Sequence, residues 1–190
     1  PPLRAWAQEI IGRIGSLVIT DAPTHAERRL PALQTGTPLR TPRETLVPLS
    51  QEEASQQAGF GVLAPRDLPK WKKGFIIFSD GVVSVMGIYD SWYPVRIIQR
   101  EQKKDLEVEF PVGDADVLEI SIRGQKGYWV EEAATSLIKG GSGYQSMEDL
   151  DWHLGEDNLL FWEEDDILYM VFGDSELSRH EMLEIAESLS

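Results

Sequence analysis

The sequence predicts an α+β fold with a curved, mainly antiparallel sheet of about seven to nine strands. We expect a short N-terminal helix and a C-terminal helix that docks on this sheet. Residues 159–172 place two apolar, aromatic-rich runs on either side of an acidic turn. Further short apolar runs, joined by short turns, fill residues 75–131. Because only two helix signals accompany so many strands, an antiparallel meander is favoured over parallel βαβ units.

The hairpin near the C-terminus is predicted by its turn. Glu164, Asp165 and Asp166 separate the apolar run that starts at Leu159 from the run that ends at Phe172. A short polar turn between two such runs is typical of a β-hairpin.

Two capping boxes predict where the helices begin. In each, a serine precedes a glutamate by three residues, Ser50 with Glu53 and Ser178 with Glu181. The first helix should cover residues 51–58 and stop at Gly59, a residue that suits the left-handed position after a helix. Four apolar residues of the second helix share one face, at spacings of three and four residues: Met182, Ile185, Ala186 and Leu189.

The intervening residues predict the strands of the sheet. Alternation is clearest where Leu118, Ile120 and Ile122 are separated by polar residues, which indicates one buried and one solvated face. The expected strands are Phe60–Ala64, Phe75–Phe78, Val82–Tyr89, Val95–Arg100, Leu106–Phe110, Val117–Arg123 and Tyr128–Glu131.

The first quarter of the chain differs in character. Residues 1–19 predict an amphipathic, juxtamembrane-like helix, with Leu3, Trp6, Ile10, Ile14 and Leu17 on one face, although two glycines weaken it. Residues 20–48 are rich in proline and threonine and predict an extended linker. Residues 49–190 are then expected to form a single α+β domain.

Charge is distributed unevenly along the chain, whose net charge is −14. Residues 1–104 carry 14 Lys/Arg and 10 Asp/Glu, whereas residues 105–190 carry 4 and 22. An acidic half of this size repels phosphate, so we expect no nucleic-acid partner. The acidic residues form either a solvated surface or a site for a cation or a basic partner.

The sequence contains no catalytic signature. It has no cysteine, and its three histidines, His25, His153 and His180, are far apart. Residues 140–143 (GGSG) lack the lysine of a phosphate loop, and no Gly-x-Ser-x-Gly elbow is present. We therefore expect no catalytic residue, no cofactor, and no triad of Ser142, His153 and Asp151.

Carboxylates and exposed aromatic residues leave other kinds of site open. The spacing of Asp149, Asp151 and Asp157 departs from an EF-hand, so it gives only a weak indication of calcium, and we expect no metal site. Trp92 and Tyr93 lie at a strand connection, where aromatic side chains often anchor partners. They form a candidate interaction surface, or else they cover the edge of the core.

Residues 50–190 resemble a bacterial family of extracytoplasmic domains of unknown function, found in membrane-anchored anti-sigma-factor-like regulators and in lipoproteins. The matching segments are residues 50–60, 65–69, 87–89, 161–169 and 183–189. Residues 3–9 resemble the stretch that follows the membrane helix in such proteins. The resemblance implies an outward-facing domain anchored to the bacterial cell membrane through a segment upstream of Pro1, and it supplies no active-site residues.

These observations predict a non-catalytic extracytoplasmic domain that senses a signal or binds a protein, as part of an anti-sigma-like regulator. The alternative is a lipoprotein-type carrier that binds a small apolar ligand in its curved sheet. A hydrolase that uses carboxylates or His153 is a third hypothesis.

Overall fold

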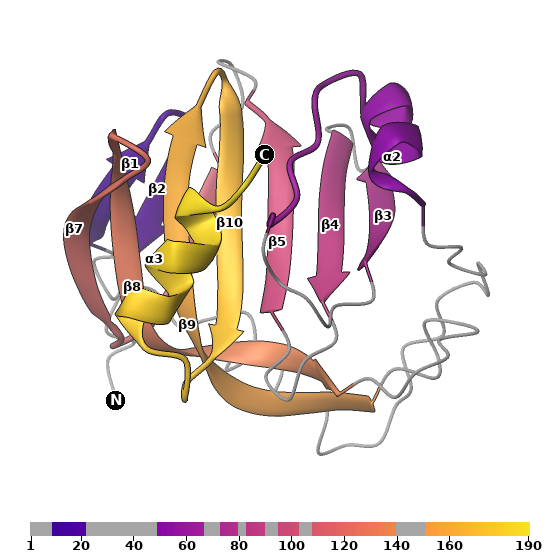
Figure 1. The fold of residues 1–190 in the computed structure, drawn as a ribbon. Coiled ribbons are helices and arrows are strands. Elements are labelled where there is room, and N and C mark those ends of the chain that lie inside the picture. The colour runs from indigo at the N-terminus through magenta and orange to yellow at the C-terminus, as the bar shows by residue number, and fades with distance from the viewer. Residues whose placement is uncertain are drawn as a thin grey trace, which may run out of the picture.

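The computed structural model describes residues 9–21, 49–66, 73–79, 83–89, 95–102, 108–139 and 151–190. The described elements form one seven-stranded sheet, one three-stranded sheet and two helices (Figure 1). The predicted α+β class, the mainly antiparallel sheet and the docked C-terminal helix are therefore confirmed.

The seven-stranded sheet is antiparallel throughout and has the order β3-β4-β5-β10-β9-β8-β7. Its central pair, β9 and β10, is the hairpin that the sequence predicts. The strands are β3 (Lys73–Ser79), β4 (Val83–Tyr89), β5 (Val95–Glu101), β7 (Asp116–Ile122), β8 (Gln125–Lys139), β9 (Asp151–Glu164) and β10 (Ile167–Asp174).

The smaller sheet has the order β1-β2-β6, with strands β1 (Ile10–Ile14), β2 (Leu17–Thr20) and β6 (Val108–Pro111). β1 and β2 form a hairpin, so the helix predicted within residues 1–19 is wrong for this segment. Gly15 adopts a left-handed φ of 53° in the connecting turn, a conformation that breaks a helix. Residues 1–8 and most of the predicted linker, residues 22–48, lie outside the described residues.

Both helices lie on one face of the large sheet, and the small sheet lies on the other (Figure 1). The helices are α2 (Gln51–Ala58) and α3 (Arg179–Glu187), and both predicted capping boxes are present. Gly59 takes the left-handed position after α2, with a φ of 81°. In the part of the chain that the structure describes, no helix is long and apolar enough to cross a membrane.

Strand β10 and residues 157–162 of β9 are buried on both faces, which explains the nearly continuous apolar sequence of residues 159–172. Leu160 and Trp162 face α3, together with Val171 of β10. Phe161 faces the small sheet, where its ring meets that of Phe110 edge-on, with the ring centroids 4.8 Å apart. Because Leu17 and Ile19 are also buried in this second layer, the folded unit includes the N-terminal hairpin and does not begin at residue 49.

The segment after α2 is not the strand that the sequence predicts at Phe60–Ala64. The buried side chain of Gln99 donates to the Leu63 carbonyl and accepts from the Leu63 N–H, both at 2.8 Å. Ala64 exchanges two backbone hydrogen bonds with Ser190. A side chain and the C-terminus thus satisfy backbone groups that a neighbouring strand would otherwise bind.

Candidate functional site

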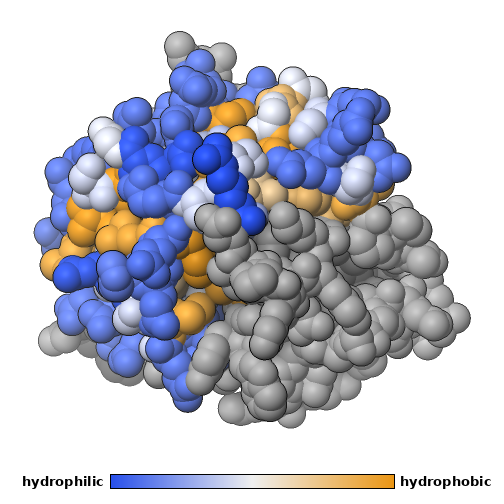
Figure 2. All heavy atoms as spheres, in the orientation of Figure 1, coloured by the Kyte–Doolittle hydropathy of each residue, from blue (hydrophilic) through white to orange (hydrophobic). Residues whose placement is uncertain are grey.

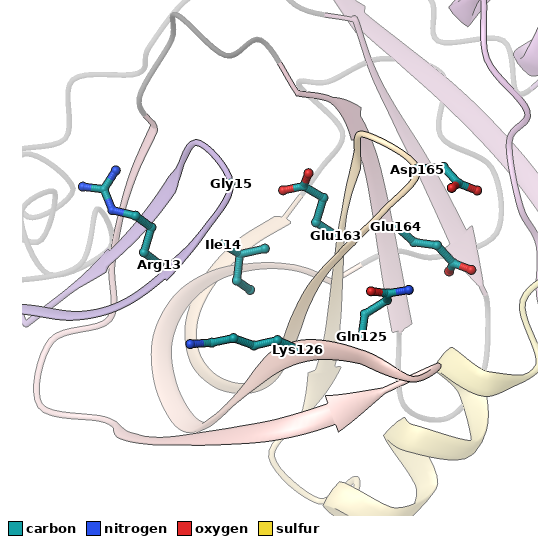
Figure 3. A pocket seen from close by; sticks show the side chains of 8 residues that line it. All are labelled: Arg13, Ile14, Gly15, Gln125, Lys126, Glu163, Glu164 and Asp165. Atoms are coloured by element: carbon teal, nitrogen blue, oxygen red, sulfur yellow. The ribbon is translucent and has the colours of Figure 1, made fainter.

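Three tight turns meet at one end of the molecule and surround an open hollow of about 470 Å³. They are the turns between β1 and β2, between β7 and β8, and between β9 and β10. We call this feature the hairpin-tip hollow (Figure 3). It is lined by Arg13, Ile14, Gly15, Gln125, Lys126, Glu163, Glu164 and Asp165.

The backbone of the turns sets the shape of the hollow. Asp165 and Asp166 have φ angles of 53° and 60°, and Arg123 and Gly124 have 52° and 77°. Two successive positive φ angles characterise the type I′ turn, whose twist matches that of the flanking strands. Aspartate tolerates this conformation well, whereas arginine rarely adopts it, so Arg123 needs compensating contacts.

Gln102 joins two of the turns. Its Oε1 accepts hydrogen bonds from the Ser16 hydroxyl and from the Ser16 N–H, the latter at 3.3 Å. The backbone N–H of Gln102 donates to the Asp166 carbonyl at 2.9 Å. The φ of 53° at Gly15 favours glycine in this turn, and the Glu163 carboxylate lies where a Cβ at this position would be.

Charges of both signs line the hollow, and two of them pair with charged residues beside it. The Lys126 ammonium lies 2.9 Å from a carboxylate oxygen of Glu119 and 5.2 Å from the centre of the Tyr128 ring. The hydrogen bond to Glu119 is the main cause that raises the pKa of Lys126 to about 12. Arg123 lies 2.7 Å from Glu164, and this hydrogen bond raises the pKa of its guanidinium.

The side chains that line the hollow are mainly charged or polar. The eight lining residues supply carboxylates, an amide, an ammonium and a guanidinium. Across the described ranges, no three His, Cys, Asp or Glu side chains are grouped to hold a metal ion.

The structure places few of the residues that the sequence singled out. Trp92, Tyr93 and Ser142 lie outside the described residues, as do His25 and Asp149. Residues 151 and 153 belong to β9, but their side chains lie outside the description, so the expectation about a triad stays a prediction. His180 is exposed on α3, with Nε2 3.4 Å from Glu184.

Asp157, considered above as a weak calcium ligand, has a different environment. It lies within β9, its side chain is 1% exposed, and it forms an ion pair with Arg96 of β5. The Arg96 guanidinium also lies 4.9 Å from the centre of the Phe172 ring. A buried carboxylate needs such a partner, and its position in a strand does not resemble a calcium loop.

Sequence reasoning missed the cationic side of the hollow. Arg13 and Lys126 are far from Glu163 in sequence, and no local pattern joins them. One signal was present: Gly15 and Ser16 separate two apolar runs, which is typical of a two-residue hairpin turn. The apolar residues at helical spacing obscured it.

Comparison with known proteins identifies a family for most of the chain. A family model described as a domain of unknown function (DUF4367) matches residues 78–189. The matched region runs from β3 to the end of α3 and includes the whole β9–β10 hairpin. No curated protein and no solved structure matches the chain.

Proposed function

We propose that this chain, which belongs to the bacterial DUF4367 family of uncharacterised domains, is a non-catalytic interaction domain of a membrane-anchored, anti-sigma-like regulator. In this proposal the domain lies outside the cytoplasmic membrane and binds a protein partner or senses a signal there. The support is the resemblance of residues 161–169 and 183–189 to such domains, together with the nature of the surfaces that the fold leaves open.

The packing of side chains on both faces of the large sheet is the observation that supports a binding role. The described side chains of β8, β9 and β10 pack against α3 on one face of the sheet and against the small sheet on the other. Among these described side chains, Trp162 fills the first face and Phe161 the second, which leaves no apolar cleft between them. The hairpin-tip hollow is open and charged, which suits polar groups of a protein partner better than an apolar ligand.

One observation favours the alternative, a carrier of an apolar ligand. Strand register pairs Ile76 of β3 with Met86 of β4, and Met86 with Ile98 of β5. Ile98 pairs with Met170, which belongs to the layer under the small sheet. The sequence thus has apolar residues at successive paired positions from β10 to β3, as a ligand that lies along β3–β5 would require.

Localisation of the natural protein in its bacterial host tests the regulator proposal. A tagged protein should be recovered with the membrane, and protease added to intact spheroplasts should degrade the domain while a cytoplasmic control protein survives. Recovery in the cytosol, or protection from the added protease, would contradict an extracytoplasmic domain.

Two further measurements separate the regulator from the carrier. Deletion of residues 10–190 should change transcription of a defined set of genes if the protein is a regulator. Mass spectrometry of organic extracts from the purified domain should recover a lipid in stoichiometric amount if the protein is a carrier. Stoichiometric lipid with unchanged transcription would replace the first proposal with the second.

A further inference from the structure

We infer that strand β7 is a docking edge for an extended, basic segment of a partner protein, which adds to the large sheet as an eighth strand. The inference rests on the proposed binding role and specifies the chemistry of the partner. It follows from a comparison of the sheet edges in the described part of the chain.

Three of these edges carry features that discourage strand addition. β1 is interrupted by a bulge between Ile10 and Gly12. β6 has four residues and ends in Pro111, which lacks an N–H to donate. β3 is already partly paired, because Leu49 exchanges hydrogen bonds of 2.9 and 3.1 Å with Phe75.

The β7 edge has none of these features. Its seven residues pair with β8 in unbroken register from Asp116–Glu131 to Ile122–Gln125, and the strand contains no proline. It is the last strand of the sheet order among the described residues, at the left margin in Figure 1. Alternate N–H and C=O groups of an edge strand point away from the sheet, so β7 presents an uninterrupted template for pairing.

Side chains on the helix-facing side of β7 favour an apolar neighbour. Leu118 pairs with Trp129, which in turn pairs with Leu160, so Leu118 is the outer end of a buried apolar row. The Leu118 side chain is nevertheless 45% exposed. Figure 2 shows apolar atoms between polar ones on this side of the described surface. An added strand with an apolar residue opposite Leu118 would extend the row by one position.

Charge around the edge selects the kind of partner. Five exposed carboxylates lie on β7 or beside it, on the preceding turn and on β8: Asp114, Asp116, Glu119, Glu131 and Glu132. The nearby cations Lys126 and Arg123 pair with Glu119 and Glu164, so the negative charge of the edge comes mainly from the other four carboxylates. A second copy of the chain would bring the same carboxylates against these, and like charges at paired strands are unfavourable. A segment that carries lysine or arginine removes this repulsion.

Geometry then gives the pattern of the partner strand. Antiparallel pairing calls for basic residues opposite Asp116 and Glu119, and apolar residues opposite Val117, Leu118 and Ile120. A capped peptide that contains Thr-Val-Lys-Val-Val-Lys has this order. The probe set consists of this peptide, the same peptide with glutamate in place of each lysine, and a third version in which alternate amides are N-methylated.

Binding of each peptide to the 190-residue chain is measured by NMR and amide exchange at low salt. In the free protein the outward amides of β7 should exchange rapidly, and the lysine peptide should protect them. The N-methylated peptide keeps the charges but cannot complete the ladder, so it should not bind. The double variant Asp116→Lys and Glu119→Lys should weaken binding about tenfold, because two attractions become repulsions.

The matched control is the double variant Glu52→Lys and Glu101→Lys, which makes the same change in net charge at exposed positions on α2 and on β5, a strand separated from β7 by β10, β9 and β8. It should bind the lysine peptide nearly as well as the unaltered chain. The inference is overturned if the control weakens binding equally, if the glutamate peptide binds as well, or if the β7 amides are already protected in the free protein. Concentration-dependent protection without peptide would make a second copy the occupant. None of these results bears on membrane localisation, so the proposed function can survive the loss of this inference.

Discussion

Replacement of Arg123 by alanine tests how the C-terminal helix is held on the sheet. The guanidinium donates to Glu164 at 2.7 Å and to the backbone carbonyls of Leu189 and Glu187 at 2.9 and 3.3 Å. It thus satisfies carbonyl groups at the C-terminal end of α3, which lack partners within the helix. A cation at this end also interacts favourably with the helix dipole.

The expected loss of stability depends on the exposure of the Arg123–Glu164 ion pair as well as on the number of hydrogen bonds that the substitution removes. Hydrogen bonds to a charged group contribute about 1.5–3 kcal/mol each when well shielded. The side chains of Arg123 and Glu164 are 21% and 24% exposed, so water can partly replace what is lost. We expect Arg123→Ala to lower the free energy of unfolding by about 2 kcal/mol. Arg123→Gly should recover about 1 kcal/mol of this, because glycine relieves the φ of 52°.

Urea unfolding measures the free energies, and amide exchange shows whether α3 is the element that loosens. Arg179→Ala is the matched control, because Arg179 is exposed in the first turn of the same helix and should leave stability nearly unchanged. The reasoning is refuted if Arg123→Ala and Arg179→Ala have equal effects, or if exchange in α3 does not accelerate. A double-mutant cycle that combines Arg123→Ala with Glu164→Gln separates the contribution of the ion pair from that of the contacts to the helix.

Three further predictions concern the same layer. Ile185→Ala should cost about 2–5 kcal/mol in urea unfolding, because the side chain is buried against the sheet, whereas Glu184→Ala on the exposed face should cost little. Ser178→Ala should cost about 1 kcal/mol at neutral pH. Because the hydrogen bonds to Ser178 lower the pKa of Glu181 below 4.5, that cost should shrink as acid protonates Glu181, and unfolding curves at several acidic pH values test this. Burial raises the pKa of Tyr169 from 10.0 to about 12, so stability should fall as pH rises through this interval, and Tyr169→Phe should flatten the fall in alkaline unfolding curves.

Turns and helix starts could be predicted from the sequence almost to the residue, whereas strand β9 begins at Asp151, well before the predicted Leu159. The β9–β10 hairpin follows from one acidic turn between apolar runs, and its two turn residues adopt the positive φ angles that such a turn requires. Both helices begin at a serine whose side chain and backbone exchange hydrogen bonds with the glutamate three residues later. Information of this kind lies within a few residues, so no knowledge of the fold is needed.

Features that depend on distant partners could not be predicted in this way. The parallel pairing of β2 with β6 joins Leu17 to Val108, and no local pattern announces a contact across so many residues. In the N-terminal segment a weak helical periodicity competed with a Gly-Ser turn, and burial of Leu17 against the large sheet favoured the strand. The hairpin-tip hollow is harder still to predict, because its charged residues come from three hairpins that only the folded sheet brings together.

The acidic half of the chain illustrates the same limit and supports the role given to β7. Its carboxylates have several structural roles. Glu181 caps a helix, Asp157 forms a buried ion pair with Arg96, and Glu164 forms an ion pair with Arg123. A solvated acidic surface is therefore an incomplete description. Asp116 differs from these three because it is exposed on an edge strand that pairs on one side only among the described residues. A negative edge of this kind repels its own copies and attracts a basic strand, so the same charge that opposes self-association also selects the partner.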